Sequence, residues 1–567
     1  LDAAMKLEGV ARHASVHACG IVISKEPLTD YLPLQYAPQN DNIVITQFEM
    51  HSVEDLGLLK MDFLGLANLT TIEETIKLVL QTKNEKIELD KTPLDDAATF
   101  KMLQTGETTG VFQLESSGMR HYLKELKPTE LEDIIAMISL YRPGPMELIP
   151  QYIRRKFGKE KITYLHPLLE PILKNTYGVG VYQEQMMRIA RDLAGFTLAE
   201  ADTLRKAIGK KIKTLLDEQK EKLINGMVKN NIPLKTANEI WNLFPPFARY
   251  GFNRSHGACY AMIGYQTAYL KAHYPIEFMA SLLNAGAGDT DRIAFLVSDA
   301  KRNGIDILPP DINRSSTSFM PEDNKIRFGL LAVKNLGANI VAAIIEERGR
   351  AGPFQDITEL LNRVKHRDLN KKSLESLIKC GALDSLGIER RAGLENIDEL
   401  LKFKSATQKN IDDSQHNLFG SSFSKNNLKL KAATMATTKE KLVWEKELLG
   451  LYISAHPLKE YVQKIENSKV MPIKNLLAIS GGNQPVPARA NIAGLISKIK
   501  KTVTKLGQPM IFAQVEDLND KMEVIVFNDA LSANPTAWQE NNVLIMSGRL
   551  SLRNGEPKLI CDKAVEL

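Results

Sequence analysis

Polar and apolar side chains alternate in a short run near the start of the chain, at residues 57–66. Glycines bound the run, and so short an apolar segment is more typical of a buried strand than of a helix. Side chains alternate along a strand, so the apolar residues share one face while Lys60 and Asp62 share the other. Buried charges are rarely left unpaired. Either the two residues form an ion pair on an edge strand facing water, or Asp62 binds a metal ion beside a phosphate-binding lysine.

Strand patterns precede this run, and helical patterns follow it. Residues 20–24 and 42–48 are rich in β-branched side chains, so we expect residues 1–66 to contain part of a sheet. From about residue 68 to 285, apolar residues recur at helical spacing between glycines and prolines. The clearest helices are predicted at 71–81 with a Thr71–Glu74 capping box, at 181–194, from 197 onwards with a Thr197–Glu200 capping box, and at 258–273.

Three further segments complete the chain. Residues 286–400 predict short helices around glycine turns. Residues 403–440 are rich in Lys, Ser, Thr, Asn and Gln, which is typical of a linker or a loop. From about residue 486 short strands follow one another, and Asn554-Gly555 predicts a two-residue hairpin turn, so this part predicts a small barrel. The fold class is α+β with several domains.

Composition narrows the class of protein. A chain of 567 residues is long enough for roughly three to five domains, and its net charge of +5 is compatible with a polyanionic partner without requiring one. Four scattered cysteines fit neither a CxxC zinc site nor a disulfide framework and predict free thiols in a reducing cytoplasm. No apolar run is long enough to span a membrane. Because the chain has neither an initiator Met nor a signal peptide, we expect it to be a piece of a longer polypeptide.

The densest positive charge lies in residues 201–213. Asp202 is spaced for i,i+3 and i,i+4 ion pairs with Arg205 and Lys206. This segment is either a solvated basic helix end or a site of phosphate recognition. In the second case Arg205 supplies a fork of donors and Lys206 a point charge.

A second candidate site lies in residues 247–257, where aromatic and basic side chains precede a predicted helix. Ser255 is the predicted N-cap, which would place His256 and unpaired backbone amides where an anion binds well. Tyr250 and Phe252 have the flat faces on which a base stacks. The alternative is that the aromatic residues belong to a core and that His256 is a polar group with its hydrogen bonds satisfied.

Three weaker patterns remain. Arg142 is presented by a rigid turn at residues 141–145. His13 and His17 have the i,i+4 spacing that a metal ion uses, but the sequence offers no third ligand, so we favour a structural or backbone-contact role. Residues 415–419 place an apolar pair inside the polar linker, as does a short peptide that docks into a partner's pocket.

Five motifs occur in a fixed order along the chain: KMDFLGL at 60–66, YRPGP at 141–145, VYQEQ at 181–185, LRKAIGKK at 204–211 and YGFNRSH at 250–256. In this order the chain resembles the bacterial DNA polymerase III alpha subunits, the C-family replicative polymerases. The resemblance covers essentially the whole chain and is more specific than any single motif.

The resemblance implies a domain layout. The expected parts are the second half of the palm (1–67), the fingers (68–285), a helix-hairpin-helix region that binds DNA and the clamp (286–402), a linker with a clamp-binding motif (403–440), a connecting segment (441–485) and an OB-fold domain (486–567). It further implies that a PHP domain, the thumb and the first half of the palm precede residue 1. The chain would then be the C-terminal two-thirds fragment of such a subunit.

The resemblance also assigns roles to residues one at a time. Asp62 matches the third palm carboxylate that binds the catalytic metals, and Lys60 matches the basic residue beside it. Arg205 and Lys206 match fingers residues that meet the incoming triphosphate. The family often has a second arginine in place of Lys206; the lysine keeps the charge but not the bidentate fork.

The remaining assignments concern nucleotide, DNA and clamp. Tyr250 and His256 match residues that line the nucleotide site, to which Arg142 is also assigned. We expect the following residues to bind DNA: Lys210, Lys211, Lys213, Lys334 and Gly337. The clamp motif corresponds to Gln415, Leu418 and Phe419.

The implied function is template-directed DNA synthesis, in which two Mg²⁺ ions assist nucleotidyl transfer from a dNTP to a primer 3′-hydroxyl. The implied partners are primer–template DNA, dNTP, the sliding clamp and other subunits of the holoenzyme in the bacterial cytoplasm, with no membrane. The fragment itself is expected to be inactive, because the paired palm aspartates would lie before residue 1. Two alternatives stay open: a non-catalytic module that binds DNA and the clamp, and an error-prone paralogue of the alpha subunit.

Overall fold

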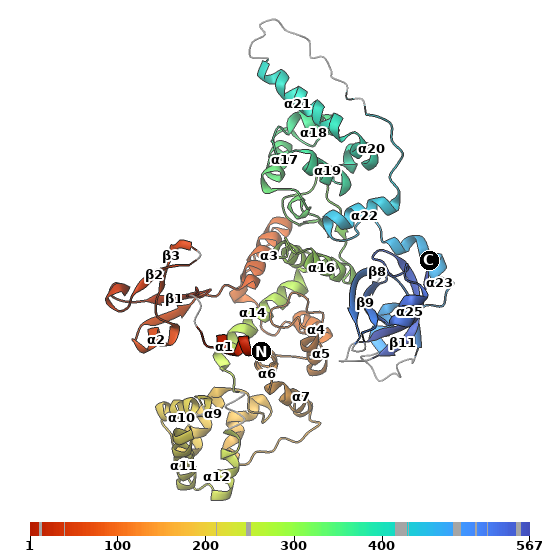
Figure 1. Cartoon of the computed structure of the whole chain (residues 1–567). Coiled ribbons are helices and arrows are strands. Elements are labelled where there is room, and N and C mark those ends of the chain that lie inside the picture. The colour runs from red at the N-terminus through yellow and green to blue at the C-terminus, as the bar shows by residue number, and fades with distance from the viewer. Residues whose placement is uncertain are drawn as a thin grey trace. The chain divides into compact units, whose positions relative to one another are not determined.

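The computed structural model describes residues 1–10, 14–38, 40–210, 213–244, 251–413, 428, 430–479, 489–504, 507–518, 520–551 and 557–567. The chain divides into two compact units, Leu1–Thr70 and Thr71–Leu567. The first unit contains small sheets, and the second is mainly helical with a β-barrel at its end (Figure 1). The predicted α+β class is confirmed.

The first unit contains two antiparallel strand pairs. β1 (Gly20–Ile23) pairs with β4 (Leu59–Asp62), and β2 (Leu34–Ala37) pairs with β3 (Asn40–Thr46). Its helices are α1 (Asp2–Leu7), the 3₁₀ helix η1 (Leu28–Asp30) and α2 (Met50–Asp55). β2 was not predicted, because its four residues follow a proline and include no β-branched side chain.

The prediction that the strand in residues 57–66 is buried is wrong. Among the strands of the described residues, β4 pairs with β1 alone, and four apolar side chains on one face of this pair are 42–54% exposed: Ile21, Ile23, Leu59 and Met61. The small core of the unit, Leu32, Val53 and Leu58, packs against Val22 on the opposite face. A two-stranded sheet is marginally stable alone, and within the described residues nothing covers its apolar face.

Residues 67–285 form helices, most of which pack around two separate cores. The elements are α3 (Ala67–Lys83), η2 (Leu89–Lys91), α4 (Ala97–Thr105), α5 (Ser117–Leu126), α6 (Leu131–Leu140), η3 (Pro145–Leu148), α7 (Ile149–Lys156), η4 (Pro167–Leu169), α8 (Glu170–Leu173), η5 (Lys174–Thr176), α9 (Gln183–Ala194), α10 (Leu198–Lys210), α11 (Lys213–Lys229), α12 (Leu234–Trp241), α14 (Arg254–His273) and α15 (Pro275–Ala285). One core joins α4, α5, α6 and α14, and the other joins α8 through α12.

The predicted end of α9 and start of α10 are confirmed, and the predicted start of α3 is wrong. Gly195 ends α9 in the left-handed conformation, with φ of 73°, as the C′ position of a helix favours. The Thr197–Glu200 capping box forms before α10, with the hydroxyl of Thr197 accepting from the Glu200 amide. Thr71 is buried inside α3, which begins four residues earlier, so the Thr71–Glu74 box does not start that helix.

Residues 286–413 form short helices and one small sheet. The elements are α16 (Thr290–Arg302), β5 (Ile307–Leu308), β6 (Met320–Glu322), β7 (Lys325–Arg327), η6 (Leu330–Ala332), α17 (Ala338–Ala351), α18 (Ile357–Arg363), α19 (Lys371–Lys379), η7 (Asp384–Leu386), α20 (Arg390–Glu395) and α21 (Ile397–Asp413). One hydrophobic core continues from α3 and α15 through this region to α22 (Thr438–Leu449).

The linker prediction is wrong for residues 403–413, because they continue α21. Phe403 packs on the core of the preceding helices, and the ammonium group of Lys404 donates to the carbonyls of His366 and Leu369 at 2.9 and 2.7 Å. These contacts extend the helix into a sequence of polar composition. Residues 414–427 lie outside the described residues.

The chain ends in a closed five-stranded barrel, as predicted. Its strands are β8 (Arg489–Val503), β9 (Pro509–Glu516), β10 (Lys521–Val526), β11 (Val543–Ser551) and β12 (Lys558–Glu566), in the order β10-β12-β11-β8-β9. The parallel pair β10–β12 closes the barrel, and the other pairs are antiparallel. The helices η8 (Pro457–Tyr461), α23 (Val462–Glu466) and α24 (Ile473–Ile479) precede it, and α25 (Asn528–Ala533) follows β10. The predicted Asn554-Gly555 turn lies outside the described residues.

Two further sequence predictions concern cysteines and membrane spans. All four cysteines are free thiols, as predicted. Among the helices of the described residues, none combines the length and the apolar character that crossing a bilayer requires.

His456 lies in the segment between α22 and the barrel. Its Nδ1 accepts the backbone N–H of Leu458 at 3.2 Å. Burial, followed by repulsion from Lys301, Lys446 and Lys459 and opposed by attraction to Asp517, lowers the pKa of His456 to about 4. This imidazole is therefore neutral in the folded protein at neutral pH.

We predict a pH-dependent contribution of His456 to stability. Between about pH 4 and pH 6.5 the unfolded chain binds a proton at His456 that the folded chain excludes, so stability rises with pH across this window. His456→Gln should flatten that rise by about 3 kcal/mol, because the pKa falls from 6.5 to about 4 and one pKa unit corresponds to about 1.4 kcal/mol. Thermal unfolding at several pH values measures the slope, with the exposed His51→Gln as a control. Equal slopes in H456Q and wild type would contradict the prediction.

Candidate active site

The face of β4 that carries Lys60 and Asp62 is built by its pairing with β1. The antiparallel register places Gly20 opposite Asp62 and Val22 opposite Lys60. The Nζ of Lys60 lies 2.6 Å from Oδ1 of Asp62. The prediction that the two charges lie side by side on one face is confirmed.

The Lys60–Asp62 ion pair holds both groups in their charged forms. The hydrogen bond from Lys60 is the main cause that lowers the pKa of Asp62, and nearby His17 lowers it further. The same hydrogen bond raises the pKa of Lys60. The side chain of Lys60 is 14% exposed and that of Asp62 is 44% exposed. The carboxylate therefore stays accessible to a ligand from solvent.

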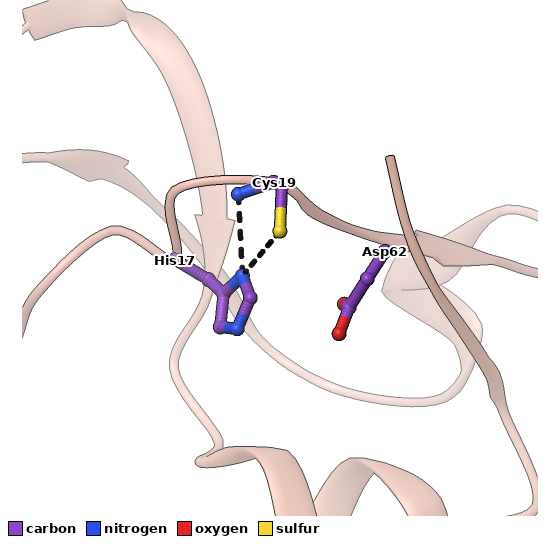
Figure 2. Close-up of side chains that lie close together, drawn as sticks. All are labelled: His17, Cys19 and Asp62. Atoms are coloured by element: carbon purple, nitrogen blue, oxygen red, sulfur yellow. Dashed lines mark hydrogen bonds between the residues drawn. The ribbon is translucent and has the colours of Figure 1, made fainter. Parts of the chain in front are cut away.

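The loop before β1 brings His17 and Cys19 next to Asp62 (Figure 2). The Nδ1 atom of His17 accepts the backbone N–H of Gly20 at 2.7 Å and that of Cys19 at 3.3 Å. The expected backbone-contact role is thus confirmed for His17, while His13 lies outside the described residues. The proximity of Cys19 to Asp62 is not predictable from spacing along the chain, because the β1–β4 register creates it.

Arg205 and Lys206 lie on α10 and share the carboxylate of Asp202. The Nη2 of Arg205 and the Nζ of Lys206 approach its two oxygens at 2.8 and 2.9 Å. These two hydrogen bonds lower the pKa of Asp202. The predicted i,i+3 and i,i+4 pairing is confirmed, and phosphate binding by the two cations stays a prediction.

Three lysines follow on the same basic segment. Lys210 ends α10 and Lys213 begins α11. Lys211 and the side chains of Lys210 and Lys213 lie outside what the structure describes.

His256 lies in the first turn of α14, but Ser255 is not its N-cap. The helix begins at Arg254, and Oδ1 of Asn253 accepts the backbone N–H of His256 at 2.8 Å. The Ser255 prediction is therefore wrong: Asn caps as well as Ser, and the hydroxyl of Ser255 donates to Asn253 at 3.0 Å instead. The exposed His256 ring lies 4.3 Å from the ring of Tyr260, centroid to centroid.

Phe252 connects three parts of this region. An isolated parallel bridge joins it to Tyr182 at the start of α9. The guanidinium of Arg142 lies 4.8 Å from the centre of its ring, and the His256 ring lies 5.6 Å away. Burial lowers the pKa of Arg142. Phe252 thus brings Arg142 and His256 together, as their assignment to one site requires, while Tyr250 lies outside the described residues.

The cations of α10 form a separate group. Across the described ranges, no hydrogen bond, ion pair or ring contact joins Arg205 or Lys206 to His256. The predicted nucleotide-binding residues therefore fall into two groups, one on α10 and one around Phe252.

Arg254 was not predicted to have a role. Its guanidinium pairs with Glu132 of α6, and its backbone N–H donates to both carboxylate oxygens of Glu184 on α9 at 3.0 Å. It thus ties the start of α14 to two other helices. In the sequence, the feature that could have indicated this role of Arg254 is its place in the YGFNRSH motif.

The predicted DNA-binding residues Lys334 and Gly337 lie in an exposed turn. Gly337 immediately precedes α17, where unpaired backbone amides begin a helix. A second turn after α19 contains Gly381, with φ of 82°, and a Cβ there would lie 2.2 Å from Nη2 of Arg390. Only glycine fits this position. The clamp residues Gln415, Leu418 and Phe419 lie outside the described residues.

Comparison with protein families places four models on the chain. The bacterial DNA polymerase III alpha NTPase domain matches residues 1–65, and the bacterial DNA polymerase III alpha subunit finger domain matches residues 68–231. A helix-hairpin-helix motif matches residues 304–393, and an OB-fold nucleic acid binding domain matches residues 490–567.

Similarity to individual proteins extends over nearly all of the chain. It is 43% identical over 566 residues to the DNA polymerase III subunit alpha of Bacillus subtilis, covering 99% of this chain and 49% of that protein. It is 40% identical over 573 residues to the subunit of Thermus aquaticus, covering 100% of this chain and 46% of that protein. The chain belongs to the bacterial DNA polymerase III alpha subunit family. It spans about half the length of the curated relatives it matches, less than the two thirds expected from sequence.

Substitutions in this polymerase III alpha family member can test which residue caps α14. Asn253→Ala should destabilise the helical region by about 1 kcal/mol, because the His256 amide loses its acceptor. Ser255→Ala should cost less, because the capping bond does not involve Ser255. Chemical denaturation of both variants measures the difference. A larger loss in S255A than in N253A would restore Ser255 as the cap.

Proposed function

We propose that the protein containing this chain catalyses template-directed DNA synthesis, transferring a nucleotidyl group from a dNTP to the 3′-hydroxyl of a primer. The observation that carries the proposal is the identity of 40–43% to DNA polymerase III alpha subunits over almost the whole chain. The geometry around Asp62 supports it, because an accessible carboxylate lies beside a lysine that suits a phosphate.

Asp62 can supply one of the oxygen ligands of a Mg²⁺ ion. Mg²⁺ prefers oxygen ligands, and Asp62 supplies a carboxylate that is 44% exposed. His17 and Cys19, its neighbours, are poor ligands for this ion. We therefore assign one Mg²⁺ ligand to Asp62 and the others to carboxylates outside this cluster. When bound, Mg²⁺ would lower the pKa of the primer hydroxyl and offset charge on the leaving pyrophosphate.

The cations of the chain would neutralise the triphosphate. Lys60 is held beside Asp62 by the ion pair. Arg205 and Lys206 share a single carboxylate, which leaves one net positive charge on that helix surface. Arg142 and His256, which both contact the ring of Phe252, would add a guanidinium and an imidazole, and Tyr250, outside the described residues, is assigned to the same site from the sequence.

We further propose the domain layout of a polymerase. Residues 1–67 would complete a palm, and the exposed apolar face of β1 and β4 supports this, since further sheet or helices would cover it. Residues 68–285 would form the fingers, 286–402 the hairpin region, 403–440 a linker with the clamp motif, 441–485 a connecting segment and 486–567 the OB-fold domain.

Binding to nucleic acid and partners follows from this layout. The backbone amides at the start of α17, beginning at Gly337, would bind a duplex phosphate beside the exposed side chain of Lys334, and Lys210, Lys211 and Lys213 would add charge. Residues 415–419 would bind the sliding clamp, and other holoenzyme subunits would bind elsewhere, in the bacterial cytoplasm.

Replacing Asp62 tests the proposed reaction. In the full-length protein, Asp62→Ala should reduce primer extension by several orders of magnitude, because a metal ligand is lost, while primer–template affinity changes little. Asp55→Ala removes a carboxylate from the neighbouring helix α2 and serves as the control. If D62A extends primers within several-fold of wild type, the non-catalytic DNA-binding and clamp-binding module becomes the better description.

Replacing Arg205 tests the nucleotide assignment. Arg205→Ala should raise the KM for dNTP or lower kcat by about tenfold, because a charge-assisted contact to phosphate contributes roughly 1.5–3 kcal/mol. Arg188→Ala is a matched control, since Arg188 on α9 likewise pairs with an aspartate of its own helix, Asp192. Steady-state kinetics and DNA affinity are measured for both. If R205A weakens only DNA binding, Arg205 contacts the duplex instead.

A further inference from the structure

The side chains around Asp62 form a donor set that magnesium does not account for. Mg²⁺ takes oxygen ligands. Beside the carboxylate of Asp62, however, lie the imidazole nitrogen of His17 and the thiol sulfur of Cys19. The ligand atoms of the three residues lie within 4.8 Å of one another, and no other such group of three occurs in the part of the chain that the structure describes. Nitrogen, sulfur and carboxylate oxygen are the ligands of protein-bound zinc.

We propose that His17, Cys19 and Asp62 form a Zn²⁺ site, with water in the fourth position. Three protein ligands and an open position are the arrangement of an accessible rather than a closed structural zinc site. The proposal goes beyond DNA synthesis and does not depend on it, because it concerns metal binding by residues of one small unit.

The separation of the first two donors fits one tetrahedral ion. The Nδ1 of His17 lies 3.7 Å from Sγ of Cys19. Bonds of about 2.0–2.1 Å from zinc to nitrogen and about 2.3 Å from zinc to sulfur, at a tetrahedral angle, separate the two donors by roughly 3.6 Å. The separation of these two atoms therefore suits one ion, and Asp62 would reach that ion by leaving its ion pair with Lys60.

Gly20 leaves space beside two of these donors, His17 and Asp62. The strand register sets it opposite Asp62. A Cβ at this position would lie 2.8 Å from Nδ1 of His17 and 3.1 Å from Oδ1 of Asp62. Any other residue would fill the space between the imidazole and the carboxylate, so glycine keeps this side of the site open.

Two existing contacts oppose the ion and limit its affinity. The Nδ1 of His17 accepts the Gly20 amide at 2.7 Å, and Lys60 pairs with Asp62 at 2.6 Å. Zinc must replace the first hydrogen bond and move the ammonium group away. If Asp62 also holds Mg²⁺ as proposed above, the two ions compete for one carboxylate.

The test uses metal-free full chain titrated with Co²⁺, whose thiolate charge-transfer absorption reports sulfur ligation, followed by displacement with Zn²⁺. Wild type should bind one equivalent with this absorption. Cys19→Ala should lose the absorption and weaken Zn²⁺ binding by at least about tenfold. Cys259→Ala removes an exposed thiol on α14 and should behave as wild type.

A second variant keeps all three ligands. Gly20→Ala should also weaken Zn²⁺ binding, because its Cβ occupies the space between His17 and Asp62. Thermal unfolding checks that each variant is folded, and Asp62→Asn replaces any variant that is not. Zinc affinity of C19A within threefold of wild type, or no thiolate absorption in wild type, overturns the site. A zinc affinity of G20A equal to that of wild type overturns the placement of the ion beside Gly20.

Discussion

The candidate active site depends on one backbone constraint, the antiparallel register that sets Gly20 opposite Asp62. A residue without a side chain faces the carboxylate, so Asp62 stays open to solvent and to ligands. Lys60 and Asp62 follow from strand alternation, and the loop carrying His17 and Cys19 follows from where β1 begins. A shift of one residue would turn Asp62, together with Lys60, to the other face of the strand pair, away from the loop that carries His17 and Cys19.

In the helical region, an aromatic residue likewise brings together side chains that lie far apart in the chain. Phe252 is bridged to the start of α9, contacts Arg142 and lies beside His256. Arg254, the next motif residue with a charged partner, fastens the same turn to α6 and α9. Motif residues far apart in the chain thus meet because hydrophobic and ion-pair contacts hold the turn before α14 against two helices. The guanidinium of Arg142 and the imidazole of His256 are thus positioned by contacts that take no part in a reaction.

Asp62 is proposed as a ligand for two kinds of metal ion. Its oxygen suits a hard ion such as Mg²⁺, and its neighbours His17 and Cys19 suit a softer one. Which ion Asp62 binds would depend on the other ligands. Oxygen atoms of other carboxylates would favour Mg²⁺, whereas the nitrogen of His17 and the sulfur of Cys19 would favour the softer ion. Before any ion binds, the ion pair with Lys60 keeps the carboxylate charged.

Local patterns in the sequence determined the strand at Asp62, the end of α9, the start of α10, the barrel, the free cysteines and the motif order that indicates the family. These depend on alternation, capping and residue order, which act over a few neighbours. Only tertiary structure decided that the apolar face of β4 is exposed, that Asn253 rather than Ser255 caps α14, that α21 continues to Asp413, and that Cys19 lies beside Asp62. Each depends on a partner distant in the chain or on a choice between near-equal local options, which no local pattern encodes.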